Sequence, residues 1–308
     1  MANNANKRVF YEWLNDNHGY FYTVNRTLQQ TESEYQNVEL VETDEMGNVL
    51  ILDSITQVGQ KVDWQYHEPM VHFPMLAHER PRRVLVIGGG DGGILREVLR
   101  HPSVESVDFV ELDQKVVEFS RQHLPDINHG AFDDERVSVH FSDGRAFVEQ
   151  ADDGRWDVAI MDMTDPFGPS KMLYTKQFFQ TVRDRLDPNN GLFTMHSESP
   201  VARPIAYQCI RRTLGSAFPV VRSAFAFVQM YATYWSFTIA SNGPDIAAFD
   251  AYTIDERIRT RGLERLRMLN GDTWQAMQVP FPYISEIHRR SVPVITDEAP
   301  DFPDRFDH

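Results

Sequence analysis

The chain has 308 residues, 42% of them hydrophobic, and a formal net charge of −15. This length and composition predict one large folded domain, or a large domain with a smaller attachment. The acidic charge disfavours nucleic acid and anionic membranes as partners, because their phosphates would be repelled, and it favours cationic ligands.

A single cysteine, Cys209, excludes an internal disulfide and favours a reducing compartment. It falls inside a predicted helix, where we expect a buried apolar residue and not a nucleophile. Residues 1–11 lack the apolar core of a signal peptide, and no apolar run approaches the length of a membrane span. We therefore expect a cytoplasmic protein.

Residues 1–63 are predicted to form a small β-domain. Runs rich in β-branched and aromatic residues are separated by glycine and aspartate turn signals, and they cover residues 20–24, 35–41 and 49–52. An antiparallel unit of this size buries little apolar surface by itself. We therefore expect it to pack on the rest of the chain or on a second subunit.

Residues 64–308 are predicted to form a doubly wound α/β domain. A helix over 64–76 opens it, with Pro69 and Pro74 expected near the helix ends, where proline is tolerated. Strands and helices then alternate, which is typical of a parallel Rossmann-like sheet that binds its ligand at the carboxyl ends of the strands. The expected strands cover 84–87, 107–111, 137–141, 158–161 and 192–195, and the expected helices cover 94–100, 114–123, 144–151, 175–186 and 201–214.

The C-terminal part departs from this alternation. Two longer apolar runs, 220–229 and 234–240, are predicted to form an antiparallel hairpin at the edge of the sheet. A charged helix over 255–267 and a proline-rich tail are expected after it.

A glycine-rich turn over residues 88–93 joins the first predicted strand of the α/β domain to a helix. Gly88, Gly90 and Gly93 fit the G-x-G-x-x-G spacing of nucleotide-binding turns, but this pattern alone is weakly specific. Asp91 is unusual there, because a pyrophosphate on the turn would meet its carboxylate, a repulsion of roughly several kcal/mol. The turn therefore disfavours NAD and ATP and favours a ligand with a positive charge.

Carboxylates follow the first four strands of the predicted sheet, namely Asp91, Glu111, Asp143, and the pair Asp162 and Asp165. Any one of them could cap a helix or shape a turn. Their repetition at successive strand ends predicts a binding site. Glu111 stands 23 residues after Gly88, close to the spacing of an acid that binds ribose hydroxyls, and Asp143 could accept from an adenine amino group.

The pair Asp162 and Asp165 suits a cationic amine, because one carboxylate can anchor the charge while the other accepts a proton. Metal binding is the alternative. No histidine or cysteine stands at ligand spacing from the pair, so we expect no metal. Tyr66 and Tyr231 are candidate walls of the site.

At these residues the chain resembles the polyamine aminopropyltransferases, the spermidine synthases and their relatives. The resemblance runs from about residue 20 to 240, and it is most specific where the glycine turn is combined with the loop Asp-x-x-Asp-Pro-x-Gly-Pro over 162–169. The other matching stretches are YQNV at 35–38, YHE at 66–68, LREV at 95–98, HPSVE at 101–105, VELD at 110–113 and DG at 143–144.

The resemblance implies transfer of the aminopropyl group of decarboxylated S-adenosylmethionine to a di- or polyamine, with putrescine giving spermidine as the first expectation, and release of 5′-methylthioadenosine. It implies a β-domain before a methyltransferase-type Rossmann domain, a homodimer, and no cofactor beyond this co-substrate. The ligands expected are therefore a sulfonium nucleoside and a cationic amine.

The resemblance also assigns residues by position. Asp162 would be the general base, assisted by Tyr66. The donor would contact Gln36, Gly88, Gly90, Asp91, Glu111, Asp143 and Gly144, with Glu111 on the ribose and Asp143 on the adenine. The acceptor would contact Tyr66, His67, Asp91, Asp162, Asp165 and Tyr231.

The chain departs from the family pattern on the acceptor side. His196 stands where the family often has glutamine, and the segment 229–235 lacks the usual proline and glycine residues. These features, with the segment 173–176 and the tail after 255, look more like the thermospermine-synthase branch. Two other functions stay open, an S-adenosylmethionine-dependent small-molecule methyltransferase and a catalytically idle polyamine-binding protein.

Overall fold

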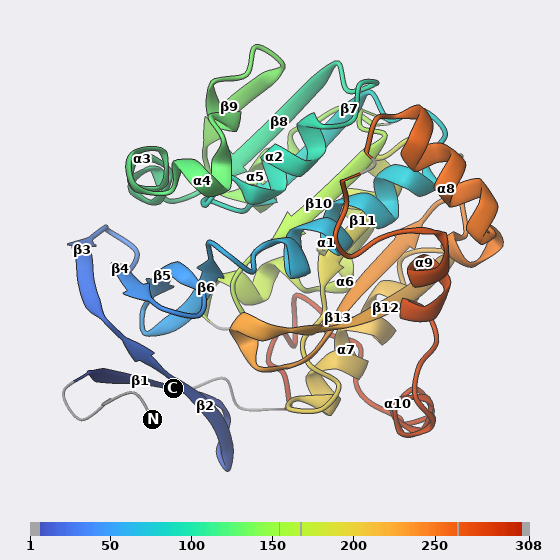
Figure 1. Ribbon diagram of the computed structural model, residues 1–308. Coiled ribbons are helices and arrows are strands. Elements are labelled where there is room, and N and C mark those ends of the chain that lie inside the picture. Colours follow the sequence, from blue (N-terminus) through green and yellow to red (C-terminus); the bar gives the residue numbers. More distant parts are fainter. Residues whose placement is uncertain (1–6, 154, 167, 264, 304–308) are drawn as a thin grey trace.

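The N-terminal part of the chain forms two small antiparallel sheets. The computed structural model describes residues 7–153, 155–166, 168–263 and 265–303. A two-stranded hairpin comes first, and a four-stranded sheet follows it (Figure 1). The hairpin consists of β1 (Arg8–Asn15) and β2 (His18–Val24), and the sheet consists of β3 (Arg26–Glu32), β4 (Asn37–Thr43), β5 (Gly47–Leu52) and β6 (Ile55–Gly59).

The sequence predicted β2, β4 and β5 but missed β1, β3 and β6. Strand β3 shows the reason most clearly, because none of its residues is buried. It therefore lacks the alternation of apolar and polar residues by which a strand is recognised. Its backbone pairs with β4 from Arg26 to Glu32, apart from an irregularity between Thr27 and Gln29, and this pairing holds it in the sheet.

The rest of the chain is built on a seven-stranded sheet in the order β12-β13-β11-β10-β7-β8-β9. The five strands from β11 to β9 are parallel. The β12–β13 hairpin lies at the edge beside β11, as predicted, and β13 pairs antiparallel with both β11 and β12. The strand order reverses at β7, which makes its carboxyl end the expected ligand site. The strands are β7 (Arg83–Gly88), β8 (Ser106–Glu111), β9 (Val137–Phe141), β10 (Val158–Asp162), β11 (Leu192–His196), β12 (Val220–Val228) and β13 (Thr233–Ser241).

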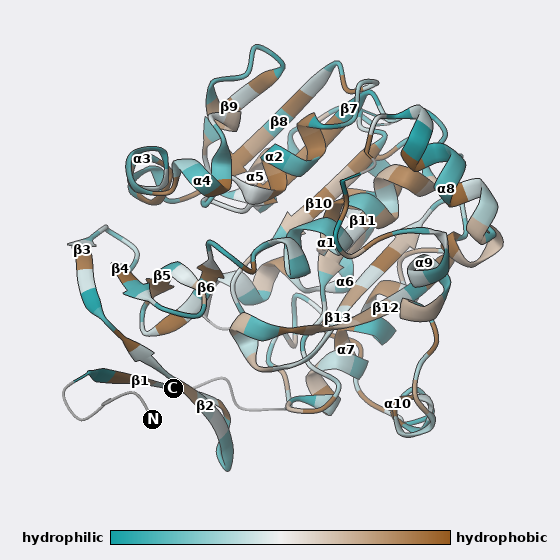
Figure 2. Cartoon of the chain, viewed as in Figure 1, coloured by the Kyte–Doolittle hydropathy of each residue, from teal (hydrophilic) through white to brown (hydrophobic). Residues whose placement is uncertain are grey.

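Helices cover both faces of this sheet, which confirms the predicted α/β class. One hydrophobic cluster joins α1 and α2 to one face, and a second joins α5, α6 and α7 to the other. Figure 2 shows hydrophobic stretches along the inner strands and hydrophilic outer faces on the helices. In the described part of the chain no helix is long and apolar enough to cross a bilayer. The helices are α1 (Trp64–Ala77), α2 (Gly93–Leu99), α3 (Gln114–His123), α4 (Pro125–Asn128), α5 (Gly144–Glu149), α6 (Lys176–Arg185), α7 (Pro204–Gly215), α8 (Ala251–Thr260), α9 (Gly271–Met277) and α10 (Pro282–Ile287).

Three predicted features differ in the structure. Pro69 lies in the interior of α1 and not near its start, and the helix continues because every residue from Tyr66 to Ala77 is buried. That packing offsets the loss of about 3 kcal/mol that an interior proline causes. The charged helix expected over 255–267 begins at Ala251 and ends at Thr260. Two residues later Gly262 has a positive φ of 69°, which turns the chain. Two short helices, α9 and α10, follow in the segment expected to be an irregular tail.

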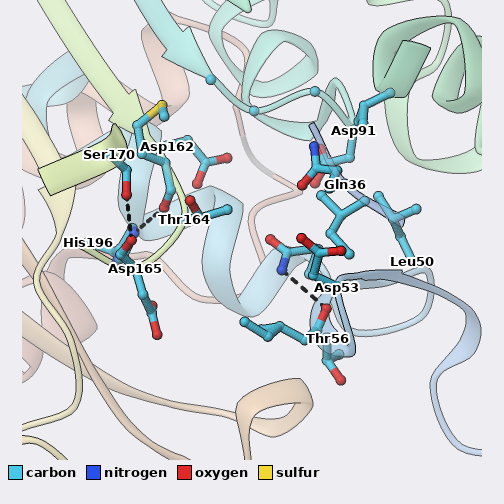
Figure 3. A pocket seen from close by; sticks show the side chains of 18 of the residues that line it. Gln36, Leu50, Asp53, Thr56, Asp91, Asp162, Thr164, Asp165, Ser170 and His196 are labelled. Atoms are coloured by element: carbon cyan, nitrogen blue, oxygen red, sulfur yellow. Dashed lines mark hydrogen bonds between the residues drawn. The ribbon is translucent and has the colours of Figure 1, made fainter. Parts of the chain in front are cut away.

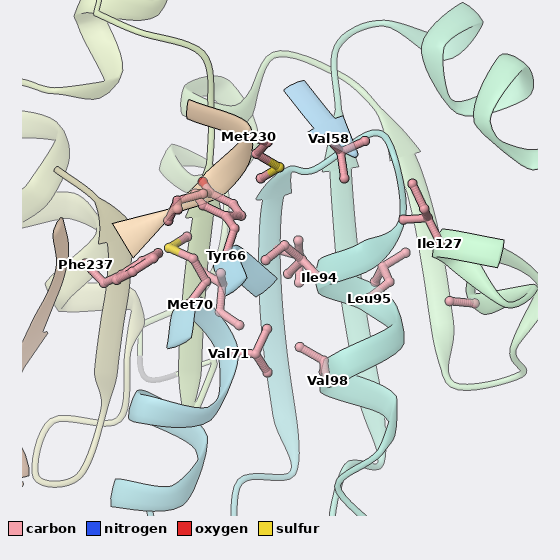
Figure 4. Packing of buried hydrophobic residues seen from close by; sticks show 14 of the residues in the cluster. Val58, Tyr66, Met70, Val71, Ile94, Leu95, Val98, Ile127, Met230 and Phe237 are labelled. Atoms are coloured by element: carbon pink, nitrogen blue, oxygen red, sulfur yellow. The ribbon is translucent and has the colours of Figure 1, made fainter. Parts of the chain in front are cut away.

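A buried ionic cluster joins α1 to α2. Helix α1 carries Tyr66, and helix α2 follows the glycine turn. Glu97 on α2 is 4% exposed. Its carboxylate lies 2.9 Å from His72 Nε2 on α1, and it pairs with Arg96 and Arg100 at 2.9 and 2.6 Å. Figure 4 shows apolar side chains packed between the same two helices, among them Val71 and Val98.

We predict that Glu97→Gln lowers the free energy of unfolding by about 3 kcal/mol or more, because it removes the buried carboxylate that pairs with Arg96 and Arg100. Urea unfolding followed by circular dichroism measures the change. Glu118→Gln, on the exposed face of α3, is the matched control and should change stability by less than about 0.5 kcal/mol. Equal losses in both variants would show that the cluster does not fasten the helices.

Candidate active site

A cavity of about 320 Å³ opens at the carboxyl ends of β7, β8 and β10. The glycine turn and the strand ends form one wall, and residues of the two N-terminal sheets form the other. Figure 3 shows Asp162, Asp165 and His196 on one side of the cavity and Gln36 and Asp91 on another. The site therefore lies at the switch point of the sheet, where the topology predicts it.

All but one of the residues assigned to the site from the sequence line this cavity. They are Gln36, Tyr66, Gly88, Gly90, Asp91, Glu111, Asp143, Gly144, Asp162, Asp165 and Tyr231. The exception is His67, which is 1% exposed and does not reach the cavity wall. The prediction that His67 contacts an acceptor is therefore wrong, because its ring lies behind the residues that line the cavity.

The glycine turn lies directly against the end of β10. Gly89 N donates to the backbone O of Asp162 at 2.9 Å. Gly88 has a φ of +77°, and a Cβ on it would lie 2.1 Å from that same oxygen. A Cβ on Gly90 would meet Val116 at 2.9 Å. Side chains at these positions would push the turn away from the strand ends.

Asp162 and Tyr66 form the polar centre of the cavity. Tyr66 Oη donates to Asp162 Oδ1 at 2.5 Å. Burial and the nearby Asp91 raise the pKa of the Asp162 carboxyl above its ordinary value. Burial also keeps the pKa of Tyr66 well above its usual range, so the phenol stays protonated and donates. A carboxylate of raised pKa beside a neutral donor is suited to accept a proton from a ligand.

Asp91 is held from behind by a chain of charges. His67 Nε2 lies 3.6 Å from Asp91 Oδ1, and His67 Nδ1 lies 3.2 Å from Asp63 Oδ2. Asp63 also pairs with Arg96 at 2.8 Å. Burial alone would lower the pKa of His67, but the two carboxylates raise it to about 10. His67 is therefore a cation at neutral pH, and its charge lowers the pKa of Asp91 against the effect of burial.

The other predicted donor residues are held by local contacts. Burial raises the pKa of Glu111 to about 7, and Glu111 Oε1 accepts from Asp113 N at 3.0 Å. Asp113 Oδ2 in turn accepts from Gln36 Nε2 at 2.9 Å, which orients the amide at the cavity. Asp143 caps α5 by accepting from Ala146 N at 2.7 Å. The same residue lines the cavity, so it both caps the helix and contributes to the site.

The structure places two further residues beside the predicted acceptor residues, which the sequence did not reveal. Glu12 of β1 and Arg203 line the cavity with Asp165 and Tyr231. Burial raises the pKa of Glu12 to about 7. The only sequence signal for Glu12 was the alternation of its strand, whose apolar residues Phe10 and Leu14 are buried.

His196 lies on the same wall, as its place at a strand end suggests. Its Nε2 is 2.6 Å from the backbone O of Met163, and its ring stacks on Trp235 with centroids 5.7 Å apart. Within the described residues, no group of three or more histidine, cysteine, aspartate or glutamate side chains is arranged to hold a metal ion.

Comparisons with known proteins show the family of the chain. The model of the spermine/spermidine synthase domain matches residues 63–250, and that of the spermidine synthase tetramerisation domain matches residues 9–59. A polyamine aminopropyltransferase of Nitrosomonas europaea is 35% identical over 276 residues, 90% of this chain and 84% of that protein. Polyamine aminopropyltransferase 2 of Hyperthermus butylicus is 35% identical over 303 residues, 97% of this chain and 98% of that protein.

Solved structures of the same kind match most of the fold. The spermidine synthase of Thermotoga maritima superposes with a TM-score of 0.84 at 33% identity, over 91% of this chain and 94% of that chain. A spermidine synthase in complex with the transition state analogue AdoDATO gives a TM-score of 0.85 at 33% identity, with the same coverage.

We predict that Gly93→Ala destabilises the protein by about 1–3 kcal/mol or more, because the added Cβ would lie 2.1 Å from His67 Cε1. The thermal unfolding midpoint measures the effect. Gly215→Ala is the matched control, since its Cβ would meet nothing within 4 Å, and it should be neutral or stabilising. Equal midpoints for the two variants would show that the His67 ring is not held in place.

Proposed function

Because the chain belongs to the spermine/spermidine synthase family, we propose that it transfers the aminopropyl group of decarboxylated S-adenosylmethionine to a diamine. The enzyme is a polyamine aminopropyltransferase. Putrescine is the acceptor proposed first, with spermidine and 5′-methylthioadenosine as products. The observation that carries the proposal is the Asp162 carboxylate, hydrogen-bonded to Tyr66 in a cavity that also contains Asp91 and Glu111.

The donor is proposed to lie along the glycine turn. Glu111 would accept from the ribose hydroxyls, and Asp143 with Gly144 would contact the adenine. Asp91 Oδ1 accepts from Gly93 N at 2.6 Å, and we assign its other oxygen to the donor's ammonium group. S-adenosylmethionine itself carries a carboxylate at that point, which Asp91 would repel.

The proposed reaction is an in-line displacement. An acceptor amine has a pKa close to that of lysine, about 10.4, so it arrives protonated at neutral pH. Asp162 takes one proton, and the freed lone pair attacks the methylene carbon beside the sulfur. The carbon–sulfur bond breaks, its electrons pass to the sulfonium, and a neutral thioether leaves. Holding both substrates in line supplies much of the rate.

The subunits are proposed to associate through the N-terminal strands. In this proposal residues 1–63 form one domain and residues 64–308 form the other. Tyr11, Trp13 and Phe21 of the β1–β2 hairpin are 66%, 59% and 66% exposed, an apolar surface of the kind that oligomers bury. A homodimer was the first expectation, and the matching tetramerisation model extends the proposal to four subunits. A cytoplasmic location remains part of the proposal.

An assay with decarboxylated S-adenosylmethionine and a panel of amines tests the function. We expect methylthioadenosine release with putrescine above that with longer amines. A higher rate with spermidine, giving thermospermine, would place the enzyme in the thermospermine branch. A parallel series of assays uses S-adenosylmethionine in place of its decarboxylated form with the same amines.

Two results would contradict the proposal. Methyl transfer from S-adenosylmethionine, with tighter binding of that compound than of its decarboxylated form, would support a methyltransferase. Amine binding by calorimetry with no product from any amine would support an idle polyamine-binding protein.

We predict that Asp162→Asn lowers kcat by about 10²–10⁴-fold, since a general base contributes that much, while methylthioadenosine binding is retained. The base must be ionised, so the wild-type rate falls as the pH falls through its pKa. Burial and Asp91 raise that pKa in the free protein, so the acid limb of kcat/KM should lie above the ordinary aspartate value of about 3.9.

The Asp162→Asn variant should lose this acid limb. Asp133→Asn, an aspartate that is 70% exposed and pairs with Arg121 at 3.4 Å, is the control and should keep the wild-type profile. An unchanged kcat in Asp162→Asn would show that another group accepts the proton of the acceptor amine.

A further inference from the structure

Arg203 is a buried cation at the acceptor end of the cavity. It immediately precedes α7 and is 6% exposed. Its Nη1 donates to Asp165 Oδ2 at 3.2 Å, and its Nε donates to the backbone O of Leu14 at 2.7 Å. One guanidinium therefore links the carboxylate of the acceptor loop to β1 of the N-terminal hairpin.

Acidic residues line the cavity together with Arg203. Glu12, Asp165 and Glu198 are among them. The side chain of Arg203 ends in a guanidinium, which is a cation in proteins. It therefore places a permanent positive charge among these carboxylates and engages one oxygen of Asp165.

We propose that Arg203 determines which amines are accepted, by occupying Asp165 and by repelling a further ammonium group at the acceptor end. The inference rests on the proposed transferase function. A diamine brings one charge beyond its reacting nitrogen, which the remaining carboxylates can balance. A triamine brings a second charge toward the guanidinium. Like charges about 5 Å apart at an intermediate dielectric weaken binding by about tenfold or more.

A purely structural role would give a different pattern. The bond to Leu14 fastens the hairpin, and Asn15 Nδ2 adds a second link through the backbone O of Ala202 at 2.9 Å. Loss of these links would impair every acceptor alike. Loss of the charge would favour longer amines over shorter ones, so the ratio between two acceptors distinguishes the roles.

The test compares Arg203→Lys, which keeps the charge, with Arg203→Met and Arg203→Gln, which remove it. The measured quantity is kcat/KM for spermidine divided by kcat/KM for putrescine. We expect this ratio to rise about tenfold in both neutral variants and to stay near the wild-type value in Arg203→Lys. The KM of the donor should not change in any of them.

Controls separate this inference from the function on which it rests. Arg26→Met removes a surface pair with Glu42 and should leave the ratio unchanged. Thermal unfolding checks that each variant folds. Calorimetry of both amines with the methylthioadenosine complex gives the same selectivity without turnover.

An active wild type whose ratio stays within about twofold in both neutral variants, or rises equally in Arg203→Lys, would overturn the role of Arg203. Wild-type protein that forms no product with any amine, but whose binding selectivity shifts as expected in the neutral variants, would overturn the transferase function and retain the role of Arg203. If neither turnover nor a shift in binding selectivity is seen, both the transferase function and the role of Arg203 are overturned.

Discussion

The contact between the glycine turn and the end of β10 is the constraint on which the site depends. Gly88 and Gly89 approach the Asp162 backbone so closely that any side chain at Gly88 would collide with it. This approach places Asp91, at the tip of the turn, on the same cavity as Asp162. The electrostatics of the site thus follow from a backbone contact, and the glycines matter because they permit it.

The cavity carboxylates differ in how they are balanced, and this difference separates their roles. Asp91 faces the His67 cation, and Asp165 faces Arg203. Asp162 instead receives a hydrogen bond from the neutral phenol of Tyr66. A neutral donor stabilises a carboxylate less than a cation does, so Asp162 keeps a higher proton affinity than Asp91. The residue proposed as the base therefore lies in surroundings that favour proton uptake.

The sequence predicted the central sheet and most of the cavity, because the strands of the α/β domain are apolar runs and topology brings their ends together. It missed β3, which has no buried residue. It placed His67 in the cavity, since sequence adjacency to Tyr66 does not reveal which face of α1 each residue occupies. It did not identify Arg203, whose partner Leu14 is 189 residues away in the chain. Local patterns carry no signal for a contact over that separation.

The pKa values of Glu12 and Glu111, both about 7, have a consequence for binding thermodynamics. Near neutral pH each carboxyl is partly protonated while the cavity is empty. A cationic ligand would lower both values and release protons to the buffer. Its apparent affinity would rise with pH until these groups are ionised, and the heat of binding would depend on the ionisation enthalpy of the buffer. Ligand entry would thus be an exchange of cations, in which hydrogen ions leave as ammonium and sulfonium arrive.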